Sequence, residues 1–292
     1  MNTPISRRSA LKKAATGAAT IATTGAIAAH HKDSEPYSFK RNIHHSACRW
    51  CYRKVELDDL CRQGKKVGLE ALDLVSFDDL PTLKKHGLEG SLLSGVPGGI
   101  ARGLNRFENH DKIVDFFQEA APRAAKEGVK RIIVFSGNRD GMDDETGLDN
   151  CKVGLERIVP IAEKHGIQII MELLNSKRNH PDYMCDHTSW GVELVKAVGS
   201  ESFKLLYDIY HMQIMDGDVI DTIKEFHPYF GHYHTGGVPG RHEIDETQEL
   251  YYPAIMKAIV DTGFDGYVAQ EFIPAWDDPI KALAHGIRTC DV

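Results

Sequence analysis

Four acidic or imidazole side chains stand at the ends of four successive apolar runs in the second half of the sequence. The runs contain MELLN, LLYDIYH, FGHYHTGG and AQEF, and these residues are Glu172, Asp208, His234 and Glu271. Three carboxylates buried together would repel one another, and each is costly to bury without a partner. A divalent cation removes that repulsion, and three oxygen ligands with one nitrogen suit Mg²⁺, Mn²⁺ or Zn²⁺. We therefore predict a site for one divalent metal ion formed by these four residues.

Each of these residues alone also has a purely structural explanation. Glu172 could form an ion pair, Asp208 could cap the helix that follows it, and His234 could be a hydrogen-bonded core histidine. Glu271 could pair with a loop arginine. The prediction of a metal site depends on their occurrence together, at equivalent positions of consecutive runs.

The segment YFGHYHTGGVPGRHE adds two further candidates beside the metal ligands. Its two histidines are two residues apart, so both would point to the same face of a strand. His232 would lie one step deeper than His234, next to the metal ligands or in contact with substrate. The glycine pair that follows allows close approach of the backbone to a small ligand, and Arg241 could bind a substrate carboxylate or hydroxyl by two hydrogen bonds.

A repeated pattern along the chain predicts the scaffold that positions these groups. Short apolar runs alternate with amphipathic stretches that have helical spacing, and a glycine often precedes the next run. The eight runs cover residues 41–47, 68–76, 87–95, 129–137, 167–175, 203–211, 229–237 and 266–274. Alternating strands and helices favour parallel strands with right-handed crossovers. Eight such units predict a single (β/α)8 TIM barrel, in which chemistry takes place at the carboxyl ends of the strands.

Composition and motifs narrow the ligands that we expect. No G-x-G-x-x-G motif follows the first run, so we expect no nucleotide cofactor. The formal net charge of −7 argues against nucleic acid as a partner, because binding to its backbone requires a basic face. The expected partner is a small-molecule substrate, and assembly into a homo-oligomer is compatible with the sequence.

The first residues have the features of an export signal. Arg7 and Arg8 form a twin-arginine pair, followed by a weakly apolar run rich in Ala, Thr and Gly. We predict a Tat-type signal peptide over residues 1–28, a linker over 29–38 and the barrel over 39–292. The apolar run is too short and too polar for a stable membrane anchor. The mature protein would then be periplasmic or extracellular, a compartment that permits disulfides, although the six cysteines do not reveal a pairing.

The ends of these runs resemble the xylose isomerase-like barrel superfamily. Within it, MELLN, DIYHMQ and GHYHTGGVPGRHE resemble the hydroxypyruvate isomerase family most closely. The resemblance implies that Glu172 and Glu271 are the acid–base pair and also bind the metal ion, while Asp208 and His234 complete the coordination.

The same resemblance implies residues that contact the substrate. The D-x-x-H spacing places His211 where the family has a histidine that touches substrate, and VPGRHE gives Arg241 a substrate role. The implied reaction is an aldose–ketose type isomerisation of a small hydroxy-oxo acid. For hydroxypyruvate the product would be tartronate semialdehyde, formed by glutamate-mediated proton transfer through an enediolate.

Three alternatives remain at this stage. Bacterial members of the family often have Gln in place of His234, whereas ketose 3-epimerases have His there, followed by a glycine-rich loop and an arginine. A ketose 3-epimerase or related sugar isomerase is therefore the nearest alternative. A metal-dependent phosphoesterase would need more histidine ligands and a basic groove. The non-enzymatic alternative is an exported sugar-binding barrel.

Overall fold

The computed structural model describes residues 37–292, and its compact barrel unit spans Phe39–Val292. The predicted export signal and residues 29–36 of the predicted linker lie outside the described residues. Between residues 37 and 292, no helix has both the length and the apolar character needed to cross a bilayer.

Eight strands form at the eight apolar runs, and all pair in parallel. The strands are β1 (His44–Ala47), β2 (Ala71–Leu72), β3 (Glu89–Gly90), β4 (Arg131–Val134), β5 (Gln168–Glu172), β6 (Phe203–Asp208), β7 (Phe230–Thr235) and β8 (Tyr267–Gln270). Six of them form a sheet in the order β1-β8-β7-β6-β5-β4, and β2 pairs with β3. Single bridges join Cys48 to Asp73 and Leu93 to Ile132, and so connect the pair to β1 and β4. The predicted TIM barrel is confirmed.

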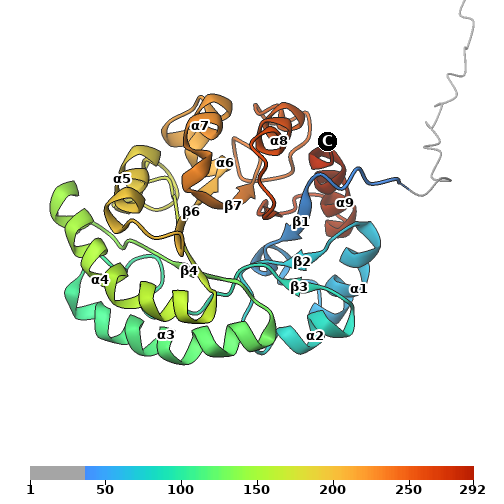
Figure 1. The fold of residues 1–292 in the computed structure, drawn as a ribbon. Helices are drawn as coiled ribbons and strands as arrows, with labels where there is room; N and C mark the ends of the chain where they lie inside the picture. Colours follow the sequence, from blue (N-terminus) through green and yellow to red (C-terminus); the bar gives the residue numbers. More distant parts are fainter. Residues whose placement is uncertain (1–36) are drawn as a thin grey trace, which may run out of the picture. The chain divides into compact units, whose positions relative to one another are not determined.

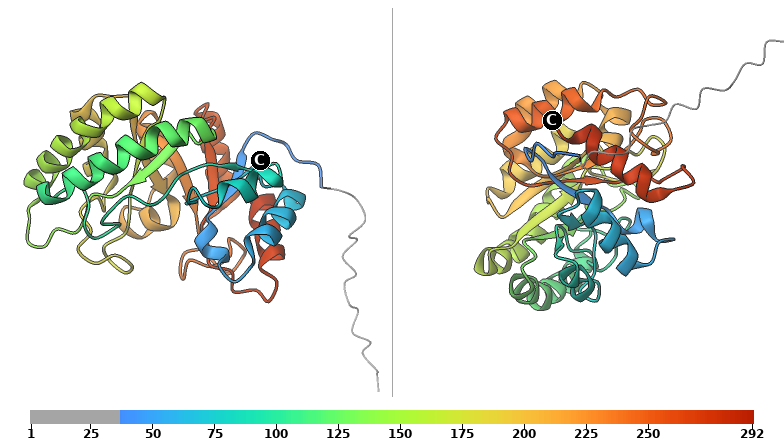
Figure 2. Two further views of the ribbon diagram at one scale, coloured as in Figure 1. Left: turned by 90° about the horizontal axis from the view of Figure 1, so that it is seen from below. Right: turned by 90° about the vertical axis from the view of Figure 1, so that its right-hand side faces the viewer.

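Helices cover the outside of the strands (Figure 1). The α-helices are α1 (Leu57–Val67), α2 (Leu80–Lys85), α3 (Phe107–Glu127), α4 (Asp144–His165), α5 (Thr188–Val198), α6 (Ile209–Met215), α7 (Val219–Phe226), α8 (Tyr252–Asp261) and α9 (Pro279–Cys290). Short 3-10 helices, η1 (Arg49–Tyr52) and η2 (His227–Tyr229), follow β1 and precede β7. The two longest helices, α3 and α4, lie against each other (Figure 2).

Local sequence signals explain where the long helices begin and end. Helix α4 begins after Asp143, whose side chain accepts a hydrogen bond from the backbone N–H of Thr146 at 2.8 Å. Helices α3 and α4 end at Gly128 and Gly166, which have φ values of 84° and 65°. Glycine adopts this left-handed conformation without the steric cost of a Cβ atom, as the sequence predicts.

The barrel has an apolar outer core and a mixed interior. The large cluster of buried side chains lies between strands and helices, and a separate small cluster consists of Leu92, Ile133, Ile170 and Leu206. A buried polar chain accompanies this small cluster: Ser46 contacts Ser91, Ser91 contacts Asp73, and Asp73 contacts His232. Ser46, Ser91 and Asp73 hydrogen-bond to one another, which offsets part of the cost of removing them from water, whereas both ring nitrogens of His232 lack a hydrogen-bond partner among residues 37–292.

The first and last residues of the barrel are tied together. Strand β1 pairs with β8, which closes the ring. The carboxylate of Asp291 accepts hydrogen bonds from the backbone N–H groups of Lys40, at 3.0 and 3.1 Å, and Arg41, at 3.3 Å. The side chain of Asn42 donates to the backbone oxygen of Val292 at 2.9 Å.

Candidate metal and catalytic site

The four predicted metal ligands come together at the carboxyl ends of neighbouring strands. Glu172 and Asp208 are the last residues of β5 and β6, His234 lies near the end of β7, and Glu271 directly follows β8. One ligand atom from each lies within 4.8 Å of the others, and all four residues are buried. Asp208 is directly opposite His234 in the β6–β7 register. Parallel pairing therefore gathers groups that are up to 99 positions apart in the sequence.

An irregularity in β7 explains the orientation of its two histidines. The β6–β7 register shifts between Leu205 and Leu206, so that Gly231 is an extra residue in β7. A Cβ atom at Gly231 would lie 2.8 Å from Cδ1 of Ile170 and 2.9 Å from Cβ of Lys204, so a larger residue would force the neighbouring strands to shift. Beyond this bulge the alternation is regular. The ring of Tyr233 packs on Phe264 at 4.8 Å, while both histidines turn away from it.

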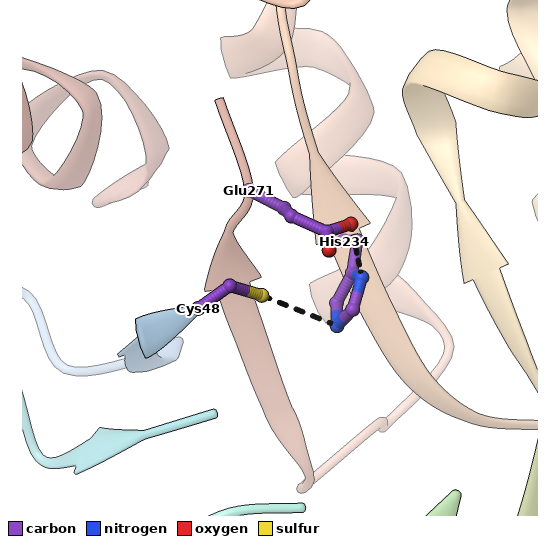
Figure 3. A group of neighbouring side chains, drawn as sticks. All are labelled: Cys48, His234 and Glu271. Carbon is purple, nitrogen blue, oxygen red and sulfur yellow. Dashed lines mark hydrogen bonds and ion pairs between the residues drawn. The ribbon is translucent and has the colours of Figure 1, made fainter. Parts of the chain in front are cut away.

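His234 occupies the centre of the cluster and uses its two nitrogens on opposite sides. Its Nδ1 lies 2.6 Å from Oε2 of Glu271, 3.3 Å from Oε1 of Glu172 and 4.0 Å from Oδ2 of Asp208. Its Nε2 points away from these carboxylates, toward Cys48, at 3.7 Å. Figure 3 shows the imidazole between Glu271 and Cys48, with one nitrogen facing each.

Glu271 accepts hydrogen bonds from three directions. Its Oε1 accepts from Nε1 of Trp50 at 2.7 Å, and its Oε2 lies 2.6 Å from both His234 Nδ1 and Arg241 Nη2. By contrast, Oε1 of Glu172 is buried and has no hydrogen-bond partner. The two glutamates therefore stand in different environments, although they share one site.

Arg241 covers the cluster from the loop after β7. Its guanidinium also contacts Asp208 at 3.4 Å and lies over the rings of Trp50 and Tyr210, at 5.2 and 5.3 Å. The loop can turn this tightly because Gly237 has no Cβ atom. A Cβ atom there would lie 2.5 Å from the backbone oxygen of Glu243. The predicted glycine loop therefore brings an arginine onto the carboxylates.

Asp208 serves both of the purposes that the sequence leaves open. Its Oδ1 accepts a hydrogen bond from the backbone N–H of His211 at 3.0 Å and so caps α6. Its Oδ2 faces Arg241 and His234. Capping and membership of the cluster are compatible because the two oxygens face different ways.

His211 presents an N–H group beside the cluster. Its Nδ1 accepts a hydrogen bond from the backbone N–H of Asn175 at 3.0 Å, so the proton of the neutral ring must reside on Nε2. That Nε2 lies 3.7 Å from Oδ2 of Asp208 and has no hydrogen-bond partner. Burial, and then the charge of Arg241, hold the pKa of His211 well below its usual range, which keeps the ring neutral.

Burial and charge shift the pKa values of the three carboxylates in different directions. Burial raises the pKa of Asp208 to about 8, against the opposing effect of Arg241. Burial, followed by the charge of Glu271, raises the pKa of Glu172. Burial acts on Glu271 in the same sense, but Arg241 and His234 outweigh it and hold its pKa well below the usual range. Groups with shifted pKa values in one buried site are typical of catalytic centres.

Three residues near the site were not predicted from the sequence. Asp73 follows β2 and lies against the far side of His234, while Cys48 and Trp50 follow β1. Asp73 could have been recognised, because ALDLVS is also an apolar run that contains a carboxylate. His232 was predicted beside the ligands or the substrate, and its closest charged partner is Asp73, at 3.1 Å from Nε2.

The chemistry of the donor set fits a divalent cation. Three carboxylates and one imidazole nitrogen converge, and Glu172 retains a buried oxygen without a partner. Oxygen and nitrogen ligands of this kind suit Mg²⁺, Mn²⁺ or Zn²⁺.

Comparison with known proteins places the chain in a family. The model of the xylose isomerase-like TIM barrel family matches residues 80–290, and the chain belongs to that family. A solved structure described as an AP endonuclease, family 2, from Brucella melitensis has a TM-score of 0.73 and 27% identity. The match covers 83% of this chain and 97% of the other.

Curated relatives further indicate that the chain is an isomerase. A human protein named "Putative hydroxypyruvate isomerase" is 34% identical over 236 residues, which are 78% of each chain. A 2-oxo-tetronate isomerase from Cupriavidus necator is 31% identical over 203 residues, which are 66% of this chain and 75% of the relative.

Proposed function

We propose that the protein is a metal-dependent isomerase of a small hydroxy-oxo acid, most simply of hydroxypyruvate to tartronate semialdehyde. The observation that carries this proposal is the convergence of Glu172 and Glu271 with Asp208 and His234 at the carboxyl ends of four strands. The names of the curated relatives support the same class of substrate.

The two glutamates supply the proton transfers that move a carbonyl between adjacent carbons. One removes a proton from the carbon that carries the hydroxyl, and the other returns a proton across the resulting enediolate. Glu172 has an oxygen without a partner that can accept a proton, whereas Trp50, His234 and Arg241 stabilise the negative charge of Glu271. A divalent cation held by the four ligands would polarise the neighbouring carbonyl and hydroxyl oxygens and stabilise the developing oxyanion.

The surrounding residues orient the substrate. The free Nε2–H of His211 can donate to a substrate oxygen. Arg241, which lies 11% exposed over the cluster, can bind a substrate carboxylate by two hydrogen bonds. Trp50 and Tyr210 flank the guanidinium and limit its movement.

The test is a metal-dependent proton exchange measured in D₂O with hydroxypyruvate. The protein with Mn²⁺ should incorporate deuterium at the carbon next to the carbonyl and form tartronate semialdehyde, and EDTA should stop both reactions. Glu172→Gln and Glu271→Gln should each lower the rate by at least about 100-fold. Glu89→Gln is the control, because Glu89 is exposed at the start of β3. Exchange that persists in both glutamine variants would contradict the proposed mechanism.

A ketose 3-epimerase is the second candidate, and His234 followed by the glycine loop and Arg241 favours it. A panel of ketoses assayed beside hydroxypyruvate distinguishes the two. A phosphoesterase has less support, because the cluster offers one histidine and the net charge is −7. Turnover of any substrate would argue against a sugar-binding protein without catalysis.

We also propose that the protein is exported through the Tat pathway. The support is the twin-arginine pair Arg7-Arg8 and the weakly apolar run after it. Replacement of both arginines by lysine should retain the protein in the cytoplasm, as measured by cell fractionation. Unchanged export of this variant would refute the proposal.

A further inference from the structure

Asp73 forms the closest contact of the His234 nitrogen that faces away from the cluster. Its Oδ2 lies 2.8 Å from Nε2 of His234, and both side chains are fully buried. Asp73 directly follows β2, so this contact crosses the barrel from β2 to β7. None of the four predicted ligands comes from this part of the chain.

The other partners of Asp73 indicate that its carboxylate acts as a hydrogen-bond acceptor. The hydroxyl of Ser91 donates to its Oδ1, Nε2 of His232 lies 3.1 Å from the same oxygen, and the thiol of Cys48 donates to Oδ2 at 3.7 Å. These polar partners of Asp73 can all act as donors, and an ionised carboxylate can only accept. His234 must therefore present a proton to Asp73 on Nε2.

The position of this proton fixes the chemistry of the opposite nitrogen. When Nε2 of a neutral imidazole carries the proton, Nδ1 has a lone pair. In the metal-free protein Nδ1 of His234 donates to Glu271 and also faces Glu172. A bound metal ion would replace that proton, and with Nε2–H retained the Nδ1 lone pair would point at the metal site. Cys48 does not compete for the role, because its sulfur is 3.7 Å from Nε2 and its thiol can donate to Asp73 (Figure 3).

We propose that Asp73 is a positioning residue that holds His234 as the Nε2–H tautomer, with Nδ1 directed at the metal site. This inference rests on the proposed function, because it assigns Nδ1 of His234 as a ligand. Carboxylates that accept from the outer N–H of a ligating histidine fix its orientation, and their loss typically weakens metal binding.

The first test compares Mn²⁺ affinity by following free aqueous Mn²⁺ in EPR spectra. Asp73→Asn should raise the dissociation constant by about 10- to 100-fold. Asp73→Glu, which keeps a carboxylate, should recover part of the affinity. Ser91→Ala is the matched control, because it removes another partner of Asp73 and leaves the contact with His234.

The second test observes the tautomer directly in wild-type protein and does not require a variant to fold. In the Zn²⁺-loaded protein labelled with ¹⁵N-histidine, NMR should show a proton on Nε2 of His234 and none on Nδ1. The chemical shift of the Nε2 proton should change in Asp73→Asn and stay the same in Ser91→Ala.

The results separate this inference from the proposed function. A wild type that binds neither Mn²⁺ nor Zn²⁺ would refute the metal site itself and the inference with it. If the wild type binds metal and Asp73→Asn binds equally tightly, or if Nδ1 carries the proton, only the positioning role is refuted.

Discussion

Replacement of Arg241 by methionine should destabilise the metal-free protein much more than the metal-loaded protein. Arg241 lies 2.6 Å from Glu271 and 3.4 Å from Asp208 and is largely buried. Removal of one partner from a buried ion pair typically costs about 3–5 kcal/mol. Because His234 and Trp50 still donate to Glu271, we expect the lower value, about 3 kcal/mol, in EDTA.

With saturating Mn²⁺ the metal ion neutralises the same carboxylates. The loss of unfolding free energy in Arg241→Met should therefore fall to about 1 kcal/mol. The difference of about 2 kcal/mol is a coupling free energy, and coupling is reciprocal. Arg241→Met should therefore bind Mn²⁺ about 30-fold more tightly than the wild type.

Urea unfolding with EDTA or Mn²⁺, together with calorimetric titration of Mn²⁺, measures both sides of this coupling. Arg139→Met is the matched control, since Arg139 pairs with Asp144 and Asp186 at 2.9 and 3.0 Å and contacts none of the four ligands. The loss of unfolding free energy in Arg139→Met should be the same with EDTA and with Mn²⁺. An equal loss for Arg241→Met in both conditions, or weaker Mn²⁺ binding, would refute the reasoning.

Three further predictions concern protonation, the tryptophan and the loop. The pKa of Asp208 is raised from 3.8 to about 8, so the folded state retains a proton that the unfolded state loses. Its stabilising contribution in EDTA should therefore disappear as the pH rises from about 4 to about 8, and Asp208→Asn should flatten this part of the curve of unfolding free energy against pH. Trp50→Phe keeps the ring beside Arg241 but removes the 2.7 Å hydrogen bond to Glu271, so kcat should fall about 10-fold with little change in KM; an unchanged kcat would contradict this role. Glu243→Ala leaves the N–H groups of Ala275 and Trp276 without their acceptor and should lower the unfolding free energy by about 2 kcal/mol, whereas a loss as small as that of an exposed Glu246→Ala would show that the contact is dispensable.

The fold was predictable because each unit repeats the same local signals. Gly128 and Gly166 end their helices where the sequence pattern places the boundaries, and the apolar run of each following strand begins directly after them. The predicted runs extend beyond the observed strands at residues such as His211, which belongs to α6. The reason is that Asp208 caps this helix at once, so the chain turns without a loop.

The candidate site was predictable to the extent that its residues share one position in the repeat. Glu172, Asp208 and Glu271 each stand at the end of a strand, and this position alone indicates that they converge. Trp50 could not be predicted, because its role depends on a turn of 3-10 helix that brings its N–H to Glu271. The different pKa values of the two glutamates also depend on neighbours that are remote in sequence.

The contacts between the two ends of the barrel have a practical consequence for protein engineering. Asp291 holds the backbone of Lys40 and Arg41, so deletion of the last two residues should loosen β1 even though it removes no part of β1 itself. A short linker from Val292 back to Phe39 would instead preserve these contacts. New termini could then be opened in an exposed connection such as Glu246–Glu249, giving a circularly permuted barrel whose strand pairs are all retained.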